Sequence, residues 1–286
     1  MNNNKTKNGL RINVDRKSGH YYCLPPKCGT SNFGYLISAI YQRVPTSKIK
    51  IFVPNNHQFS FVPYIWFYDK MRKDVLKTGK DFESFTNTLF DMAWEEEAPV
   101  GMILTRHPLT RLYSSWANRF SSKNPVIVKA YTKYVETINE NFHNNITDEP
   151  VPDKNGMRVT FLAFFKFLNS KIWQRHRNFH WLPIQAACDY CNLKYDFIIN
   201  QEDASRQSEL FLKNQNLQQY GPLGGSYTDL RGKSGGSISQ SLTIGQRFAE
   251  IQKYYREKIP KELVLGVYEN FKLDFLLFNY KLDGFI

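Results

Sequence analysis

Hydrophobic positions near the start of the chain change from a strand-like run to a helical period across one short loop. The run at 20–24 (HYYCL) is rich in strand-forming residues, and two prolines end it. After Gly29, apolar residues recur at the spacing of one helix face. The members of that face are Phe33, Leu36, Ile37, Ile40 and Tyr41. The pattern predicts a strand, a tight loop and a helix in direct succession.

The same change of period occurs a second time. The apolar run at 99–105 (PVGMILT) predicts a buried strand, and a second helix face follows it. The members of this face are Leu109, Leu112, Tyr113, Trp116 and Phe120. Between the two units, residues 51–53 predict a short strand, and the residues up to about 94 predict aromatic-rich helices.

Later segments continue the alternation of strands and helices. Residues 161–168 and 248–259 predict helices, with Pro260 ending the second, and residues 195–199 predict a strand. Residues 221–241 are rich in Gly and Ser and predict a mobile loop. Strands that alternate with helices favour an α/β fold with a mainly parallel sheet flanked by helices. We expect a polar, mobile segment over 1–19 and a single domain over 20–286.

Composition narrows the class of protein. Of 286 residues, 42% are hydrophobic and 15% aromatic, which excludes a mainly disordered chain. Lys and Arg total 38 against 26 Asp and Glu, and the net charge of +12 favours anionic partners. Nucleic acid, a phosphorylated cofactor, an acidic polysaccharide, a membrane surface or simply a solvated basic surface all fit this charge. No apolar run approaches the roughly 20 residues of a membrane span, and the N-terminus lacks the apolar stretch of a signal peptide.

The four cysteines fall in two pairs, Cys23 with Cys28 and Cys188 with Cys191. The second pair is a C-x-x-C, which fits a redox pair, half a zinc site, a local disulfide or two structural thiols. A zinc site of four cysteines is disfavoured because the first pair flanks a different motif. We therefore expect no metal.

The first motif that carries chemistry is the loop PPKCGTSN at 25–32. It lies between the predicted strand and helix, where backbone N–H groups and the positive end of the helix dipole favour a phosphate. Lys27 supplies a charge, Gly29 permits close backbone approach, and Thr30 and Ser31 supply hydroxyls. The loop lacks the order of residues of a P-loop, because Lys27 precedes the glycine. The alternative is a helix N-cap formed by Thr30 or Ser31.

The second motif follows the second predicted strand, where Arg106 stands at the carboxyl end of the strand and Ser114 lies in the next helix. Ligands of open α/β sheets bind at the carboxyl ends of strands. Arg106 and Ser114 therefore predict a second phosphate site, with Arg106 binding through its planar fork. Arg111 is a weaker candidate, because a helical position can equally be solvated or paired.

Taken in order, these segments resemble one family. PPKCGTSN and TRHPLTRLYSSW are similar to the 5′-phosphosulfate loop and the 3′-phosphate motif of sulfotransferases. HWLP at 180–183, CDYC at 188–191, YDFI at 195–198 and YENFKLDFLLFNY at 268–280 continue the pattern. This order resembles the Golgi carbohydrate sulfotransferases of the chondroitin 4-O-sulfotransferase and HNK-1 sulfotransferase group, over about residues 21–280.

The resemblance implies the sulfotransferase fold with its P-loop-like strand, loop and helix, and an enzyme that moves a sulfuryl group. The implied donor is 3′-phosphoadenosine 5′-phosphosulfate (PAPS), with PAP as the product, and the implied acceptor is a hydroxyl of a glycosaminoglycan-like carbohydrate. Arg106 and Ser114 would bind the 3′-phosphate. The residues that would surround the 5′-phosphosulfate are Lys27, Cys28, Gly29, Thr30, Ser31 and Asn32. The group also implies the Golgi lumen, with the cytoplasm as the alternative because no anchor or signal is visible.

Catalysis in such an enzyme needs charge stabilisation and a base. Lys27 would stabilise the charge that builds on the leaving oxygen, and a histidine would take the proton of the acceptor. His180, in the HWLP segment, is the first candidate for the base and His57 the second, with a structural histidine as the alternative for each. His107 stands where the family often has an acidic residue, and we assign it no catalytic role.

Other interpretations of the sequence stay open at this point. Arg231 and Lys233 fit a lid over the donor or a solvated loop equally well. A catalytically inactive relative that binds sulfated glycans would share every motif. A nucleic-acid-binding protein fits the charge, but no zinc-finger, KH or RNP1-like pattern is present.

Overall fold

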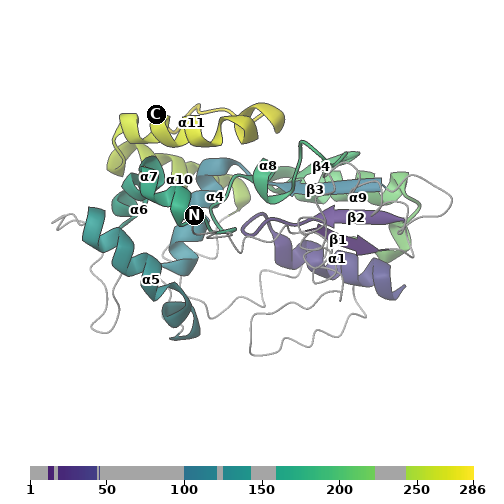
Figure 1. The fold of residues 1–286 in the computed structure, drawn as a ribbon. Coiled ribbons are helices and arrows are strands. Elements are labelled where there is room, and N and C mark those ends of the chain that lie inside the picture. The colour runs from purple at the N-terminus through teal and green to yellow at the C-terminus, as the bar shows by residue number, and fades with distance from the viewer. Residues whose placement is uncertain are drawn as a thin grey trace. The chain divides into compact units, whose positions relative to one another are not determined.

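The computed structural model describes residues 12–15, 19–43, 45, 100–120, 125–142, 159–222 and 243–286. The chain divides into two compact units, each formed by two stretches of sequence (Figure 1). Unit 1 comprises Met1–Arg106 and Ile184–Tyr227, and unit 2 comprises His107–Pro183 and Thr228–Ile286. The predicted mobile loop falls almost wholly outside the described residues, as do the elements predicted between 51 and 94.

Unit 1 is built on a four-stranded sheet in the order β1-β2-β3-β4. The strands are β1 (Ile12–Asp15), β2 (His20–Cys23), β3 (Val100–Thr105) and β4 (Phe197–Asn200). β2 pairs parallel with β3 and β3 pairs parallel with β4, whereas β1 pairs antiparallel with β2. The predicted α/β class with a mainly parallel sheet is confirmed. β1 lies inside the segment predicted to be mobile, and its Ile12 is buried.

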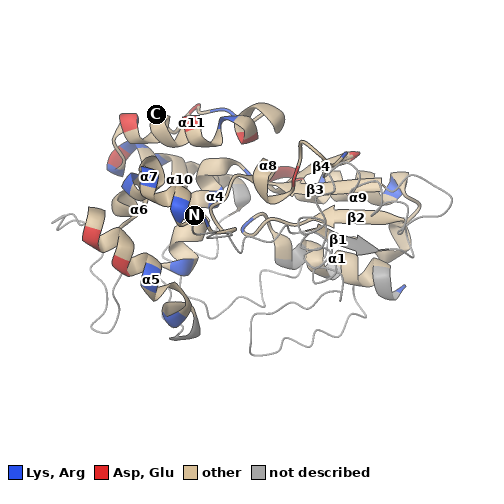
Figure 2. Ribbon diagram, viewed as in Figure 1, with Lys and Arg blue, Asp and Glu red and all other residues tan. Residues whose placement is uncertain are grey.

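Because β2, β3 and β4 run parallel, their carboxyl ends lie at one edge of the sheet. None of these three strands carries Lys, Arg, Asp or Glu (Figure 2). The polar residues that directly follow the strands therefore gather at this edge.

In the described part of unit 1, α1 (Thr30–Gln42) follows β2 and α9 (Ala204–Asn214) follows β4, whereas α8 (Ile184–Ala187) precedes β4. Short 3-10 turns are η2 (Gln201–Asp203) and η3 (Gln218–Tyr220). The predicted apolar face of α1 is confirmed, since Phe33, Leu36, Ile37 and Ile40 are all buried. This face anchors α1 and thereby fixes the loop that precedes it.

The YDFI segment holds β4 against β3. The amide of Gly101 donates to the Asp196 carboxylate at 2.9 Å, and the amide of Asp196 donates to the Gly101 carbonyl at 2.8 Å. Burial alone would raise the pKa of Asp196, but the Gly101 amide and the Lys194 ammonium lower it below the usual range. A side chain at Gly101 would collide with the Tyr21 ring, so only glycine fits there. The hydrogen bond from the Gly101 amide to Asp196 is strongest while the carboxyl group is ionised. Its contribution to stability is lost as the pH falls through the lowered pKa of Asp196.

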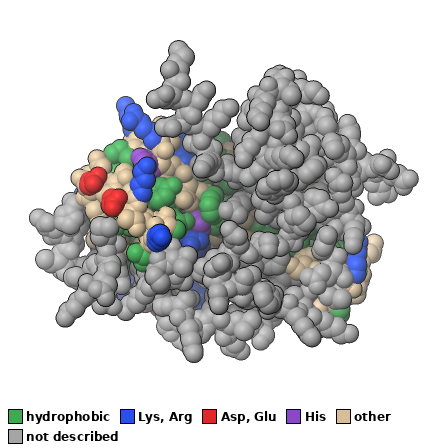
Figure 3. All heavy atoms as spheres, turned by 60° about the horizontal axis from the view of Figure 1, so that its bottom comes forward, with side chains coloured by type: hydrophobic (Ala, Val, Ile, Leu, Met, Phe, Trp, Pro, Cys, Tyr) green, Lys and Arg blue, Asp and Glu red, His purple; other side chains and the backbone are tan. Residues whose placement is uncertain are grey.

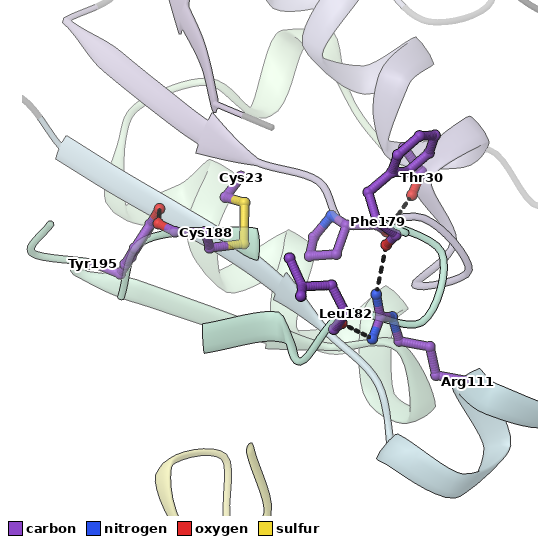
Figure 4. Close-up of a disulfide and its surroundings, with 8 residues drawn as sticks. Cys23, Thr30, Arg111, Phe179, Leu182, Cys188 and Tyr195 are labelled. Carbon is purple, nitrogen blue, oxygen red and sulfur yellow. Dashed lines mark hydrogen bonds between the residues drawn. A yellow bond between two sulfur atoms is a disulfide. The ribbon is translucent and has the colours of Figure 1, made fainter. Parts of the chain in front are cut away.

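A disulfide joins Cys23, the last residue of β2, to Cys188, which follows α8 (Figure 4). The Cα atoms of the two cysteines are 5.7 Å apart, and 165 positions separate them in the sequence. Neither Cys28, which is buried, nor Cys191, which is exposed, is part of a disulfide. None of the four alternatives for the C-x-x-C, namely a redox pair, half a zinc site, a local disulfide or two structural thiols, is therefore correct, because Cys188 is bonded to Cys23. The fold brings one cysteine of each sequence pair together.

Unit 2 consists of helices. They are α4 (Pro108–Arg119), α5 (Pro125–Phe142), α6 (Phe161–Asn169), α7 (Lys171–Arg175), α10 (Ile244–Lys258) and α11 (Lys261–Leu277). The predicted helices α4, α6 and α10 are confirmed, and α10 ends just before Pro260. Buried aromatic rings fill the core, with Trp116, Phe161 and Phe164 among them.

Neither a membrane-crossing helix nor a metal-binding cluster occurs in the described part of the chain. Of the helices in that part, none combines the length and the apolar character that a bilayer requires. The same residues contain no group of three or more His, Cys, Asp or Glu that could hold a metal ion.

Candidate functional site

In the loop between β2 and α1, two hydrogen bonds share the Pro25 carbonyl as their acceptor. The Pro25 carbonyl accepts the amide of Cys28 at 3.3 Å and the hydroxyl of Thr30 at 2.7 Å. Lys27 and Gly29 both have left-handed backbone conformations, with φ of 72° and 81°. The turn therefore needs a glycine at Gly29 and forces Lys27 into a conformation that disfavours a Cβ.

The amino end of α1 carries no side-chain cap. Gly29 is the N-cap residue, and among the described residues no side-chain cap hydrogen bond is made at this helix start. The Thr30 hydroxyl donates to Pro25 instead, so the alternative of a Thr30 or Ser31 N-cap is wrong. Amides at a helix start without such a cap are suited to bind an anion. Ser31 and Asn32 lie on this first turn, whereas Cys28 is fully buried and its amide already donates to the Pro25 carbonyl.

Arg106 reaches this loop from the neighbouring strand. It follows β3 directly, and its guanidinium donates to the Lys27 carbonyl at 2.8 Å. This hydrogen bond fixes the carbonyl of Lys27, whose backbone is in the disfavoured left-handed conformation. Two predicted site residues from segments 79 positions apart, Lys27 and Arg106, are thus brought together in unit 1.

The remaining residues of the second motif lie in unit 2. Ser114 is partly exposed on α4. Arg111 is fully buried and donates to the Leu182 carbonyl at 2.7 Å and the Phe179 carbonyl at 3.1 Å (Figure 4). Of the two alternatives for Arg111, the paired one is confirmed. This residue ties α4 to the segment that contains HWLP.

His180 is buried and linked on both sides of its ring. Its Nε2 contacts the Arg119 guanidinium, and its Nδ1 lies 2.9 Å from both the Tyr131 hydroxyl and the Asn178 amide oxygen. Because a guanidinium only donates, Nε2 accepts and Nδ1 carries the proton. The lone pair that a general base would use therefore faces Arg119. These contacts favour a structural role in unit 2 over the predicted role as a base.

His107 has a structural role, and we assign it no catalytic role from the sequence. Its Nδ1 accepts the amide of Leu109 at the start of α4, and its Nε2 donates to the Lys281 carbonyl at 2.8 Å. The ring also stacks on Phe285 with a centroid separation of 4.5 Å. His107 thus caps α4 and anchors the end of the chain to unit 2.

Three predicted site residues lie outside the described part of the chain: His57, the second candidate base, and Arg231 and Lys233 of the predicted lid. One residue near the loop was missed by sequence reasoning. Gln201 follows β4, and its side chain lies against Gly29. The available signal was its position directly after the third parallel strand.

Gly29→Ala should lower the free energy of unfolding by about 1–2 kcal/mol, because a Cβ disfavours the left-handed conformation. The added methyl also meets the Gln201 side chain at 3.4 Å. Gly245→Ala in α10 is the matched control, since a Cβ there has no neighbour within 4 Å. Urea unfolding of both variants is the measurement. Equal stability of Gly29→Ala and the wild type would contradict the assigned backbone conformation.

Comparisons with known proteins show the family of the chain. The chain belongs to the Sulfotransferase family, whose family model matches residues 10–281. It is similar to carbohydrate sulfotransferase 14 of Danio rerio, at 26% identity over 96% of this chain and 63% of the relative. Carbohydrate sulfotransferase 12 of Xenopus laevis is 22% identical over 93% of this chain and 59% of the relative. Carbohydrate sulfotransferase 11 of Rattus norvegicus is 26% identical over 64% of this chain and 47% of the relative.

The chain thus spans about half to three-fifths of the length of the curated relatives it matches. No solved structure gives a significant match. The one family model nevertheless covers the β2–loop–α1 segment, Arg106 and both units of the chain.

Proposed function

We propose that the protein is a PAPS-dependent sulfotransferase that sulfates a hydroxyl of a carbohydrate. The observation that carries the proposal is the loop of unit 1, where Lys27 and Arg106 lie beside a helix start without a side-chain cap. Membership of the Sulfotransferase family and similarity to carbohydrate sulfotransferases support the same function. The residues present fit the 5′-phosphosulfate, because backbone amides, a glycine and a lysine suit a compact anion.

When bound, PAPS supplies an activated sulfuryl group and leaves as PAP. The task of the chain is to stabilise the charge that builds on the leaving phosphate oxygen, for which a lysine ammonium and oriented amides are suited. Arg106 holds the Lys27 carbonyl and so keeps the loop in one conformation. Positioning of donor and acceptor supplies most of the remaining acceleration, as in phosphoryl transfer.

Exposed cations of unit 2 support an anionic glycan as the acceptor, such as a chondroitin-like glycosaminoglycan. Lys129 and Lys133 are exposed on α5, and Arg175 and Arg177 are exposed at and after α7. The two elements are neighbours, since the Tyr134 ring of α5 lies 6.4 Å from that of His176. Figure 3 shows Lys, Arg and His side chains, together with acidic ones, on the described part of one face. The net charge of +12 also favours an anionic acceptor.

The donor half of the proposal is tested by calorimetric titration with PAP and with adenosine 5′-monophosphate. We expect PAP to bind in the micromolar range or tighter and the monophosphate much more weakly. Absence of PAP binding by the folded protein would refute the proposed donor.

Arg106→Ala and Ser114→Ala should weaken PAP binding through the 3′-phosphate, and Arg106→Ala should do so more. We expect a loss of about tenfold to a hundredfold for Arg106, because hydrogen bonds to charged groups contribute about 1.5–3 kcal/mol. The loss for Ser114 should stay below about tenfold. The control ligand is adenosine 5′-monophosphate, which lacks the 3′-phosphate. Equal losses for both ligands would show that these residues do not bind that phosphate.

His180→Ala should lower the free energy of unfolding by about 1–3 kcal/mol, because it removes the hydrogen bonds that the buried imidazole makes with the Tyr131 hydroxyl and the Asn178 amide oxygen. The measurement pairs urea unfolding with the turnover of sulfate transfer. Loss of turnover by about a hundredfold with unchanged stability would instead establish His180 as the general base. His57→Ala is the companion variant, since His57 is the second proposed base.

We also propose the Golgi lumen as the site of action and Arg231 and Lys233 as further donor ligands. The Cys23–Cys188 disulfide supports an oxidising compartment, where such bonds persist. Both proposals rest otherwise on the resemblance to Golgi carbohydrate sulfotransferases.

A further inference from the structure

Gln201 stands at the third of three parallel strand ends at the same edge of the sheet. The loop follows β2, Arg106 follows β3, and Gln201 follows β4 and begins η2. The register places these strands side by side, with β3 in the middle. A side chain at the end of β4 that contacts the β2 loop therefore reaches across the end of β3.

The Gln201 side chain makes that contact at Gly29. A Cβ at Gly29 would lie 3.4 Å from Cγ of Gln201 and 3.7 Å from both Cδ and Nε2. The carboxamide therefore covers the bare face of the glycine that begins α1. The same glycine is the N-cap residue without a side-chain cap, so the carboxamide lies beside the proposed anion site.

In the described part of the chain, the oxygen of this carboxamide, Oε1, is buried and has no hydrogen-bond partner. A buried polar atom without a partner is destabilising, and such atoms are few in native proteins. Half a turn of the amide exchanges its nitrogen and oxygen ends. If residue 201 only packed against Gly29, an aliphatic side chain would do so equally well.

We propose that Gln201 is a further ligand of the nucleotide, donating from Nε2 to an oxygen of the 5′-phosphosulfate at the loop. This role rests on the proposed function. A carboxamide donates two hydrogens without a charge, so it suits a phosphate or sulfate oxygen that the loop amides already bind. A carboxylate at the same place would repel the anion. Gln201 is thus a positioning and specificity residue contributed by β4.

The test compares Gln201→Met and Gln201→Glu with Gln219→Glu, which adds the same charge at an exposed position of unit 1. The probes are PAP and adenosine 3′-monophosphate, which lacks the 5′-phosphate. We expect PAP binding to weaken about tenfold for Gln201→Met and about a hundredfold for Gln201→Glu, as for the loss of a charged hydrogen bond and the gain of repulsion. Adenosine 3′-monophosphate should bind all variants alike, and Gln219→Glu should match the wild type.

The stability of the unliganded protein is measured in parallel. Gln201→Met should unfold at the same urea concentration as the wild type or a higher one, since it removes an unsatisfied oxygen. Wild-type PAP affinity in both Gln201 variants would overturn this role and leave the proposed function standing. Equal losses for the two nucleotides would also overturn it. Failure of the wild type to bind PAP would refute the proposed function and this role together.

Discussion

Replacing Lys27 by alanine should reduce the turnover of sulfate transfer by about a hundredfold to a thousandfold, the usual effect of removing one group that stabilises developing charge. The charge builds on the leaving phosphate oxygen, and the ammonium lies on the loop proposed to hold it. The fold should survive, because Lys27 is not part of the hydrophobic core. Turnover and urea unfolding of the same preparation are the two measurements.

Lys27→Gly is the matched control, because the backbone of Lys27 is left-handed with φ of 72°. Glycine adopts that conformation without the cost of about 1–2 kcal/mol that a Cβ carries. We therefore expect Lys27→Gly to be more stable than Lys27→Ala and equally slow. Near-normal turnover in either variant would contradict the role of the ammonium. Lower stability of the glycine variant would contradict the backbone conformation.

Replacing both Cys23 and Cys188 by serine should lower the free energy of unfolding by about 2–5 kcal/mol, as for other native disulfides. The bond joins positions 165 residues apart and lies at the end of β2, just before the loop. Dithiothreitol should destabilise the wild type similarly and leave the double variant unchanged.

Cys191→Ser is the control for this prediction, because Cys191 is an exposed free thiol. It should unfold like the wild type. Two results together would show that the disulfide is absent. The double variant would be as stable as the wild type, and the wild type would have four reactive thiols after denaturation without reductant.

The helices that sequence reasoning recovered have one apolar face, whereas α11, which it missed, does not stand out in that way. α11 buries Val264, Val267 and Phe271, yet Leu273 and Leu276 are exposed on the same helix. Apolar residues around the whole helix hide the period on which prediction depends. The pairing of Cys23 with Cys188 was equally hidden, because a disulfide depends on which strand and helix ends the fold brings together.

The candidate site was predictable only as far as local geometry determines it. The strand, loop and helix at Lys27 and Gly29 follow from residue types within one short segment. The tasks of Arg111 and His180 follow from buried partners on other elements, which no local spacing reveals. Gln201 is found only by knowing that β4 ends beside the β2 loop.

Transfer of labelled sulfate from PAPS to a panel of glycans tests the central claim most directly. The panel should hold chondroitin, dermatan, desulfated heparin and neutral oligosaccharides, with Lys27→Ala as the matched inactive variant. We predict that at least one glycan becomes labelled, with one PAP released for each sulfate transferred, and that Lys27→Ala loses nearly all of this signal. Tight PAP binding without label on any glycan would contradict the claim and identify an inactive relative.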